Sequence, residues 1–288
     1  MQLTSEAPAS FRSSAERPGP IGLIREGFAD IVSRRRLIVY LVQAGLKKSG
    51  ADTIFGNVWW VLDPLLQMLV YVVLVSVIFA RNQPDYPLFI FAAILPWKWF
   101  ASAVQDGTVS VMSAGQLIKQ IHFPKIVMPL AAATSGVANF AFGLIPLFGL
   151  LLLFYRDRLS IWLLAIPVIA LVQFLFTLPL AIVLAALNVF YRDISNVMRH
   201  IIRLWFYLSP GLYAIDQLKG ISKNHPIVAD LLLLNPFATL FSAYRNAIYN
   251  EAPPDWFELA RLAGVSIVLL AGAIWVFKRL EPSFAKVL

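Results

Sequence analysis

Long apolar runs separated by short polar segments dominate the hydrophobic pattern of the chain. A helix needs about 20 apolar residues to cross a hydrocarbon core roughly 30 Å thick. Runs of this kind occupy residues 58–80, 88–104, 126–154, 161–190, 194–213 and 259–277. Prolines interrupt the third and fourth runs, where a neighbouring group must satisfy each freed carbonyl, at Pro129, Pro146, Pro167 and Pro179. The pattern predicts an all-α integral membrane protein with six transmembrane helices.

Two further segments are apolar but do not form a crossing. Between residues 23 and 46, apolar positions recur at spacings of three and four on both sides of the basic residues 34–36. This spacing predicts an amphipathic helix in the headgroup layer, and packing on the protein's own cytoplasmic surface is a compatible alternative. An apolar stretch from residue 231 is cut by Asn235-Pro236 and resumes over 237–249. Because each piece is too short to cross, they predict a re-entrant or interfacial helical hairpin between spans five and six.

The same pattern predicts how the chain is divided. Residues 1–20 are rich in Ser, Ala, Pro and Arg and are followed by no apolar segment typical of a cleaved signal peptide. We expect residues 1–20 to form a flexible cytoplasmic tail, 21–57 the amphipathic interfacial region, and 58–288 a six-helix transmembrane domain.

Composition supports the membrane class and excludes several others. Hydrophobic residues make up 59% of the 288 positions and charged residues 14%, whereas soluble domains carry about 25% charged residues. The chain has no cysteine, which excludes disulfides, thiolate metal sites and a cysteine nucleophile. The net charge of +8 resides in short loops between apolar runs, so membrane lipids explain it better than nucleic acid.

The distribution of Lys and Arg predicts the orientation. With the N-terminus placed in the cytoplasm, 16 of the 24 Lys and Arg residues lie on the cytoplasmic side, seven lie outside, and Lys98 lies within a span. Short cytoplasmic loops carry such an excess of positive charge. Six spans with both termini in the cytoplasm are the consistent arrangement.

The motif that binds ATP phosphates is not present. Gly45 and Gly50 have the spacing of the two glycines in a phosphate loop, but Ala51 and Asp52 replace the Lys and the Ser or Thr that must follow. We therefore expect no cofactor on this chain. If transport is driven by ATP, a partner subunit must bind ATP and Mg²⁺.

Metal-dependent and ion-coupled chemistry also lack their usual residues. The acidic residues near spans are single and far apart, and the three histidines form no ligand pair, so no metal site is predicted. Ion-coupled transporters carry charges in the middle of spans, and here Asp63 and Lys98 are the exceptions. We interpret Asp63, which precedes Pro64, as a helix-start residue, and Lys98, between Trp97 and Trp99, as a snorkelling anchor in an aromatic belt.

Residues 113–125 separate the second and third predicted spans on the cytoplasmic side. Leu117, Ile118 and Ile121 form a small apolar stripe beside Lys119 and Gln120. A short amphipathic helix of this kind can dock in a groove of a partner protein. An ordinary surface-loop helix is the alternative.

Four segments in order resemble the membrane subunits of ABC type-2 exporters. They are residues 48–66 (KSGADTIFGNVWWVLDPLL), 117–130 (LIKQIHFPKIVMPL), 187–194 (LNVFYRDI) and 235–249 (NPFATLFSAYRNAIY). Within that family the chain is most similar to the subgroup that exports O-antigen, capsule or teichoic acid polymers, and the resemblance covers about residues 23–288.

The resemblance implies a homodimer of this chain with two copies of an ABC nucleotide-binding subunit, in a bacterial cytoplasmic (inner) membrane. It implies that each ATPase grips a coupling helix, and that the hairpin, here roughly residues 221–249, closes the path outside. The coupling-helix residues in this sequence are Gln116, Leu117, Ile118, Lys119, Gln120, Ile121, His122 and Phe123.

The resemblance further implies a channel lined by aromatic side chains, on which sugars stack. The candidates in this sequence are Trp59, Trp60, Tyr71, Trp205, Phe206, Tyr207 and Tyr213, and aromatic-belt residues at span ends are the alternative. A basic cluster could attract the diphosphate of a polyprenyl-linked substrate, or could reflect topology and contact with anionic lipids. It consists of Arg34, Arg35, Arg36, Lys47 and Lys48.

The sequence therefore predicts a transport subunit, without an ATPase of its own, that exports a lipid-linked polysaccharide. Efflux of a drug, small lipid or haem by the same architecture is one alternative, and a membrane-embedded glycan-modifying enzyme is another.

Overall fold

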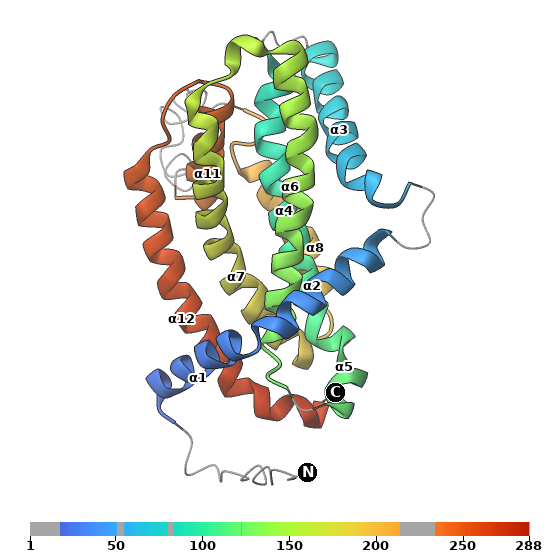
Figure 1. Ribbon diagram of the computed structural model, residues 1–288, viewed down its shortest axis with the longest axis vertical. Helices are drawn as coiled ribbons and strands as arrows, with labels where there is room; N and C mark the ends of the chain where they lie inside the picture. The colour runs from blue at the N-terminus through green and yellow to red at the C-terminus, as the bar shows by residue number, and fades with distance from the viewer. Residues whose placement is uncertain (1–17, 51–54, 80–82, 122, 214–233, 288) are drawn as a thin grey trace, which may run out of the picture.

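The computed structural model describes residues 18–50, 55–79, 83–121, 123–213 and 234–287, and these form helices without any strand (Figure 1). Five helices in this part of the chain are long and apolar enough to cross a membrane. They are Trp59–Ile78, Tyr86–Ser113, Val127–Phe154, Ile161–Phe190 and Trp256–Phe284. Five of the six predicted runs are thus confirmed as long apolar helices, and the chain is an all-α, multi-pass membrane protein.

Helix α4 (Tyr86–Ser113) is the centre of the bundle. It packs against α3 (Trp59–Val72), which continues as one π-helical segment over Val73–Ile78, and against α6 (Val127–Phe154) and α7 (Ile166–Phe190). Helix α12 (Trp256–Val287) covers the other side of α7. Most residues of α4 are buried, whereas α3 exposes a long apolar face to its surroundings. The hydrophobic pattern of the sequence does not distinguish these two helices, because apolar residues dominate both.

Small and polar residues hold α4 against α7. A Cβ atom on Gly107 would lie 2.7 Å from the Cβ atom of Ala181, so only glycine allows this close approach. Nearer the N-terminal ends of α4 and α7, Nε2 of the buried Gln173 donates a hydrogen bond of 2.7 Å to the carbonyl of Pro96. A side-chain amide thus makes a hydrogen bond to the backbone beside a proline inside the apolar bundle.

The fifth predicted span, 194–213, differs from the expectation. Helix α8 (Ile194–Leu208) ends after 15 residues, a length of about 22 Å, and residues 209–213 continue as turns. The predicted hairpin is present in part as α11 (Pro236–Ile248), whose N-terminus is capped by the Asn235 side chain accepting from the Phe237 backbone N–H at 3.0 Å. Residues 221–233 of that hairpin lie outside the described residues.

The single amphipathic helix expected over 23–46 is two helices, α1 (Pro20–Ser33) and α2 (Arg35–Gly50), which meet at Arg34. Helix α1 packs on α12 and α2 packs on α6. Both helices therefore use one face to cover the protein itself. Most of the expected tail, residues 1–17, lies outside the described residues.

The bundle has two distinct ends (Figure 1). One end holds α5 (Gly115–Gln120) together with the C-terminal ends of α7 and α12, where the rings of Phe190 and Phe284 lie 5.9 Å apart. At the other end, Arg158 in the connection between α6 and α7 contacts the start of α4 and the segment between α11 and α12. We call these the α5 end and the Arg158 end.

Candidate functional site

Helix α5 presents a mainly polar face. Leu117 and Ile118 are half-buried and pack against the protein's own core, as does Phe123. Ile121 is 54% exposed. The other exposed residues of the predicted coupling helix are Gln116, Lys119 and Gln120, and His122 lies outside the described residues. The apolar stripe expected from the sequence is therefore divided, with two members facing inward and Ile121 facing outward.

An ion-pair cluster joins the segment after α5 to α1 and α12. The Nζ atom of Lys278 lies 3.0 Å from Glu26, 2.8 Å from Asp30 and 3.0 Å from Glu281. Glu281 in turn accepts a hydrogen bond of 2.7 Å from the backbone N–H of Lys125. We call these five residues the Lys278 junction. Through this junction, the segment that follows α5 is tied to α1 and α12.

The predicted basic cluster lies at the break between α1 and α2 and at the two ends of α2. Arg34 occupies the break between α1 and α2, and Arg35 and Arg36 begin α2. These three residues and Lys47 are exposed. Lys48 also belongs to α2, but its side chain lies outside what the structure describes.

The predicted aromatic set does not form one surface. The rings of Tyr71 and Phe206 are 5.9 Å apart and both residues are buried, whereas Tyr207 is 53% exposed. Trp205 is half-buried and its indole N–H donates a hydrogen bond of 3.0 Å to Asn235. Tyr213 lies beyond the end of α8. The side chains of Trp205 and Phe206 thus join α8 to α4, α7 and α11 through aromatic rings of the bundle core. The ring of Trp97 on α4, for example, lies 6.4 Å from that of Trp205 and 5.2 Å from that of Phe206.

The other two aromatic candidates, Trp59 and Trp60, line a cavity of about 330 Å³ between α3, α4 and α6. Asp63 and Lys98 form an ion pair at this cavity. The remaining lining residues are Pro64, Leu95, Trp99, Ser102, Asn139 and Phe140. Asp63 and Lys98, interpreted from the sequence as a helix-start residue and a snorkelling anchor, are each other's partners in this ion pair.

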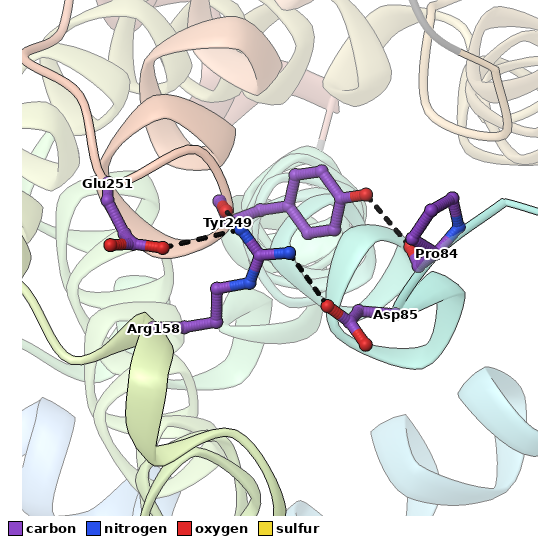
Figure 2. Close-up of polar contacts among 5 residues, drawn as sticks. All are labelled: Pro84, Asp85, Arg158, Tyr249 and Glu251. Atoms are coloured by element: carbon purple, nitrogen blue, oxygen red, sulfur yellow. Dashed lines mark hydrogen bonds and ion pairs between the residues drawn. The ribbon is translucent and has the colours of Figure 1, made fainter.

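At the Arg158 end, one guanidinium connects three segments of the chain. Figure 2 shows Arg158 between Asp85, at 2.8 Å, and Glu251, at 3.3 Å. The guanidinium also lies over the ring of Tyr249, 5.2 Å from its centre, and the Tyr249 hydroxyl donates a hydrogen bond of 2.8 Å to the carbonyl of Pro84. The hydrogen bond to Asp85 raises the pKa of Arg158 above its ordinary value, so the guanidinium stays charged.

A second arginine joins α11 to the end of α8. Arg245 is 5% exposed, and its guanidinium donates hydrogen bonds to the carbonyls of Pro210, at 2.6 Å, of Tyr213, at 3.2 Å, and of Gly211. It also lies 3.6 Å from the ring centre of Phe89. Three carbonyls of the segment just beyond α8 are thereby satisfied inside the protein.

Sequence reasoning did not find Arg158, Arg245 or the Asp63–Lys98 pair as structural partners. The partners of the two arginines lie 32 to 93 residues away in the chain. The one sequence signal was the position of Arg245 within an apolar segment. Within the described ranges, no group of three or more His, Asp and Glu side chains gathers to hold a metal ion.

Comparison with known proteins gives a consistent result. No family model matches the chain. The chain is similar to the O-antigen export system permease protein RfbA of Myxococcus xanthus, with 34% identity over 266 residues, which cover 92% of this chain and 99% of that relative. Two proteins of the same name from Klebsiella pneumoniae are 29% and 28% identical, each over 88% of this chain and 95% of the relative. The similarity extends over nearly the whole of each relative.

Proposed function

We propose that this chain, which belongs to the family of O-antigen export permeases, is the membrane-spanning subunit of an ATP-driven ABC exporter for an O-antigen-type, lipid-linked polysaccharide. The observation that carries the proposal is the 34% identity to a permease of that name over 92% of this chain, combined with a bundle of long apolar helices. The three relatives favour neither small-molecule efflux nor a glycan-modifying enzyme, so we propose neither.

We also propose six crossings and a hairpin, divided as the sequence predicts into a tail (1–20), an interfacial region (21–57) and a permease domain (58–288). The two ends of the bundle support the sixth crossing. Helix α7 finishes at the α5 end, whereas Glu251, just before α12, lies at the Arg158 end. The chain between them must pass from one end to the other, and under this proposal α8 begins that passage.

The contacts of Arg245 support a broken fifth crossing. Backbone groups that leave a helix inside a membrane must find partners within the protein. Arg245 donates to three carbonyls just beyond α8, so a helix of 15 residues can end inside the bundle. Under this proposal α11 is the second half of a hairpin that faces the outer side.

We place the α5 end in the cytoplasm of a bacterial cell, with the protein in the inner membrane and both termini inside. Arg34, Arg35 and Arg36 are exposed and directly follow α1, which reaches this end through the Lys278 junction, as positively charged loops on the cytoplasmic side would. Contact of this basic cluster, Lys48 included, with anionic lipid or with the diphosphate of the substrate fits the same orientation.

In the proposed complex, two copies of this chain bind two ATPase subunits, which hold ATP and Mg²⁺. Each ATPase docks on α5 through Ile121, Gln116, Lys119 and Gln120. The Lys278 junction supports a mechanical role for this contact, because it connects the segment after α5 to α1 and α12. Aromatic residues of α3 and α8, among them the exposed Trp59 and Tyr207, are the proposed lining of the path between the two copies.

Deletion of the gene in its own host tests the proposed function. We expect surface polysaccharide, measured by antibody or lectin labelling of intact cells, to disappear while lipid-linked polymer accumulates inside. Plasmid-borne wild-type chain should restore the surface polymer. Surface polymer at the wild-type level in the deletion strain would contradict the proposal.

A further inference from the structure

We propose that the cavity between α3, α4 and α6 is a binding site for a short saccharide segment of the exported polymer. This inference rests on the proposed function and assigns a substrate contact inside one subunit. It is argued from the charge, the unpaired polar atoms and the aromatic walls of the cavity.

The charges at the cavity favour a neutral, hydroxyl-rich ligand. The side chain of Asp63 is 61% exposed although the residue lies in a helix long and apolar enough to cross a membrane. A carboxylate in such a position is costly unless it faces a polar cavity or a ligand. Lys98 pairs with it, so the pair carries no net charge to attract a diphosphate. The carboxylate oxygens keep the capacity to accept hydrogen bonds from hydroxyl groups.

Two buried polar atoms of residues that line the cavity have no partner within the described part of the chain. They are the indole N–H of Trp99, on α4, and the side-chain oxygen of Asn139, on α6. Trp99 is only 2% exposed, and both residues line the cavity. Buried polar atoms in folded proteins are nearly always paired, and each exception calls for an explanation. One is a donor and the other an acceptor, which matches a hydroxyl group because a hydroxyl both accepts and donates.

The remaining walls fit the apolar faces of a sugar ring. Trp59 and Trp60 come from α3, and Trp99 and Phe140 from the two opposite helices. Trp60 is held by the ring of Phe142 at 5.0 Å. The volume of about 330 Å³ lies at the lower end of the range for small-molecule sites. It suits a short saccharide segment rather than a long stretch of polymer.

A single-cysteine protection experiment tests this assignment, because the native chain has no cysteine. Ser102 lines the cavity, and its hydroxyl donates to the carbonyl of Trp99 at 3.0 Å. Ser110 is the matched control, since it is also half-buried on α4 and donates to the carbonyl three residues earlier, that of Gly107, at 2.7 Å. Ser102→Cys and Ser110→Cys are labelled with a small maleimide in the purified permease–ATPase complex.

The probe is the lipid-free repeat-unit oligosaccharide prepared from the host's own polymer. We expect it to slow labelling of Ser102→Cys at least about five-fold and to leave Ser110→Cys unchanged. Removing the indole N–H with Trp99→Phe should weaken the protection about five-fold in oligosaccharide concentration, as the loss of one hydrogen bond does. Pyrophosphate should give no protection. Equal effects at both cysteines, or protection by pyrophosphate, would overturn the assignment.

Tryptophan fluorescence gives a second measurement that requires no labelling. The oligosaccharide should shift the emission of the wild type. It should also shift the emission of the control Trp162→Phe, which removes an indole in the connection to α7 at the Arg158 end. The shift should shrink in Trp59→Phe/Trp60→Phe, in which Trp99 is the one tryptophan left in the cavity wall. Absence of both protection and an emission shift in otherwise active wild type would mean that the cavity holds water alone. That outcome removes the cavity assignment and leaves the proposed function standing, whereas surface polymer in the deletion strain removes the proposed function itself.

Discussion

The Nη2 atom of Arg158 lies 2.8 Å from Oδ2 of Asp85, a residue whose backbone adopts the left-handed conformation with φ 48°. Glu251, the second carboxylate on this guanidinium, has φ 53°. Non-glycine residues adopt this conformation at a cost in free energy, and the surrounding contacts must offset it. One cation therefore holds two strained connections, before α4 and before α12, against the connection between α6 and α7.

Replacing Arg158 with Gln should loosen both connections together. We expect the free energy of unfolding to fall by about 1 kcal/mol, because the two ion pairs are partly exposed and screened by solvent. Hydrogen exchange should accelerate in residues 83–86 and 249–252 at the same time. Arg156→Gln is the control, since the Arg156 side chain donates to the carbonyl of Leu152 on the preceding helix. Faster exchange in only one of the two segments would contradict a shared role.

The contribution of Arg158 should also be independent of pH in the working range. Its pKa is raised by the hydrogen bond to Asp85, so the stabilisation from its positive charge is fully present below the unfolded pKa and is lost only above the folded one. Both values lie far above neutrality. The difference in melting temperature between wild type and Arg158→Gln should therefore stay constant between roughly pH 6 and pH 9.

An introduced carboxylate should act differently within α5 and just after it. Ile121→Asp places a carboxylate at the exposed position that follows α5, so we expect it to reduce co-purification of the ATPase at least about ten-fold, with the melting temperature unchanged. Leu117→Asp places the same group against the core, so the melting temperature should fall. Undiminished co-purification with Ile121→Asp would show that the ATPase docks elsewhere.

The Lys278 junction should be sensitive to loss of its cation. The side chains of Lys278 and Glu281 are only 9% and 10% exposed, so Lys278→Met leaves carboxylates near one another without a counter-charge. We expect a loss of about 3 kcal/mol in stability and a drop in ATP-driven transport. Lys278→Arg keeps the charge and should retain most of both. Thermal melts in detergent measure the stability. If Lys278→Met were as stable as the wild type, the cation would not be needed to hold the Lys278 junction together.

Arg245 should be required where α8 ends. Arg245→Met leaves the carbonyls of Pro210, Gly211 and Tyr213 without their donor, so we expect about 3 kcal/mol of destabilisation and rapid proteolysis near residue 213. Arg245→Lys keeps a cation but not the planar fork that reaches several carbonyls, and it should be intermediate. Limited proteolysis of purified protein measures the effect. Equal resistance of all three proteins would show that the hydrogen bonds are dispensable.

The sequence predicted the spans well because membrane crossing depends on run length, which is a local property. The end of α8 was not predictable in this way. Residues 194–213 form a less apolar run, with Arg199, His200 and Arg203 in its first turns. The arginine that satisfies the carbonyls after Leu208 lies more than 30 residues further along the chain. The ion pair of Asp63 with Lys98 was missed for the same reason, since the two residues are 35 positions apart on different helices.

The sequence indicated which segments belong to the candidate site, but not which of their side chains face the core and which are exposed. Leu117, Ile118 and Ile121 form one stripe on a helical projection, yet α5 is short and ends at Gln120. Ile121 follows in an extended conformation, which turns it away from the two residues that pack on the core. Likewise, the aromatic residues of α8 could not be divided into buried and exposed members until their neighbours on α4 and α11 were known.

Transport by the purified complex tests the central claim most directly. The permease and its ATPase are reconstituted into liposomes together with the lipid-linked polysaccharide, and delivery of polymer to the side opposite the ATPase is measured with a glycosidase confined to that side. We predict cleavage that requires ATP and stops when the ATPase carries a mutated phosphate loop. Delivery at the same rate without ATP, or no delivery by a complex that hydrolyses ATP normally, would contradict the account.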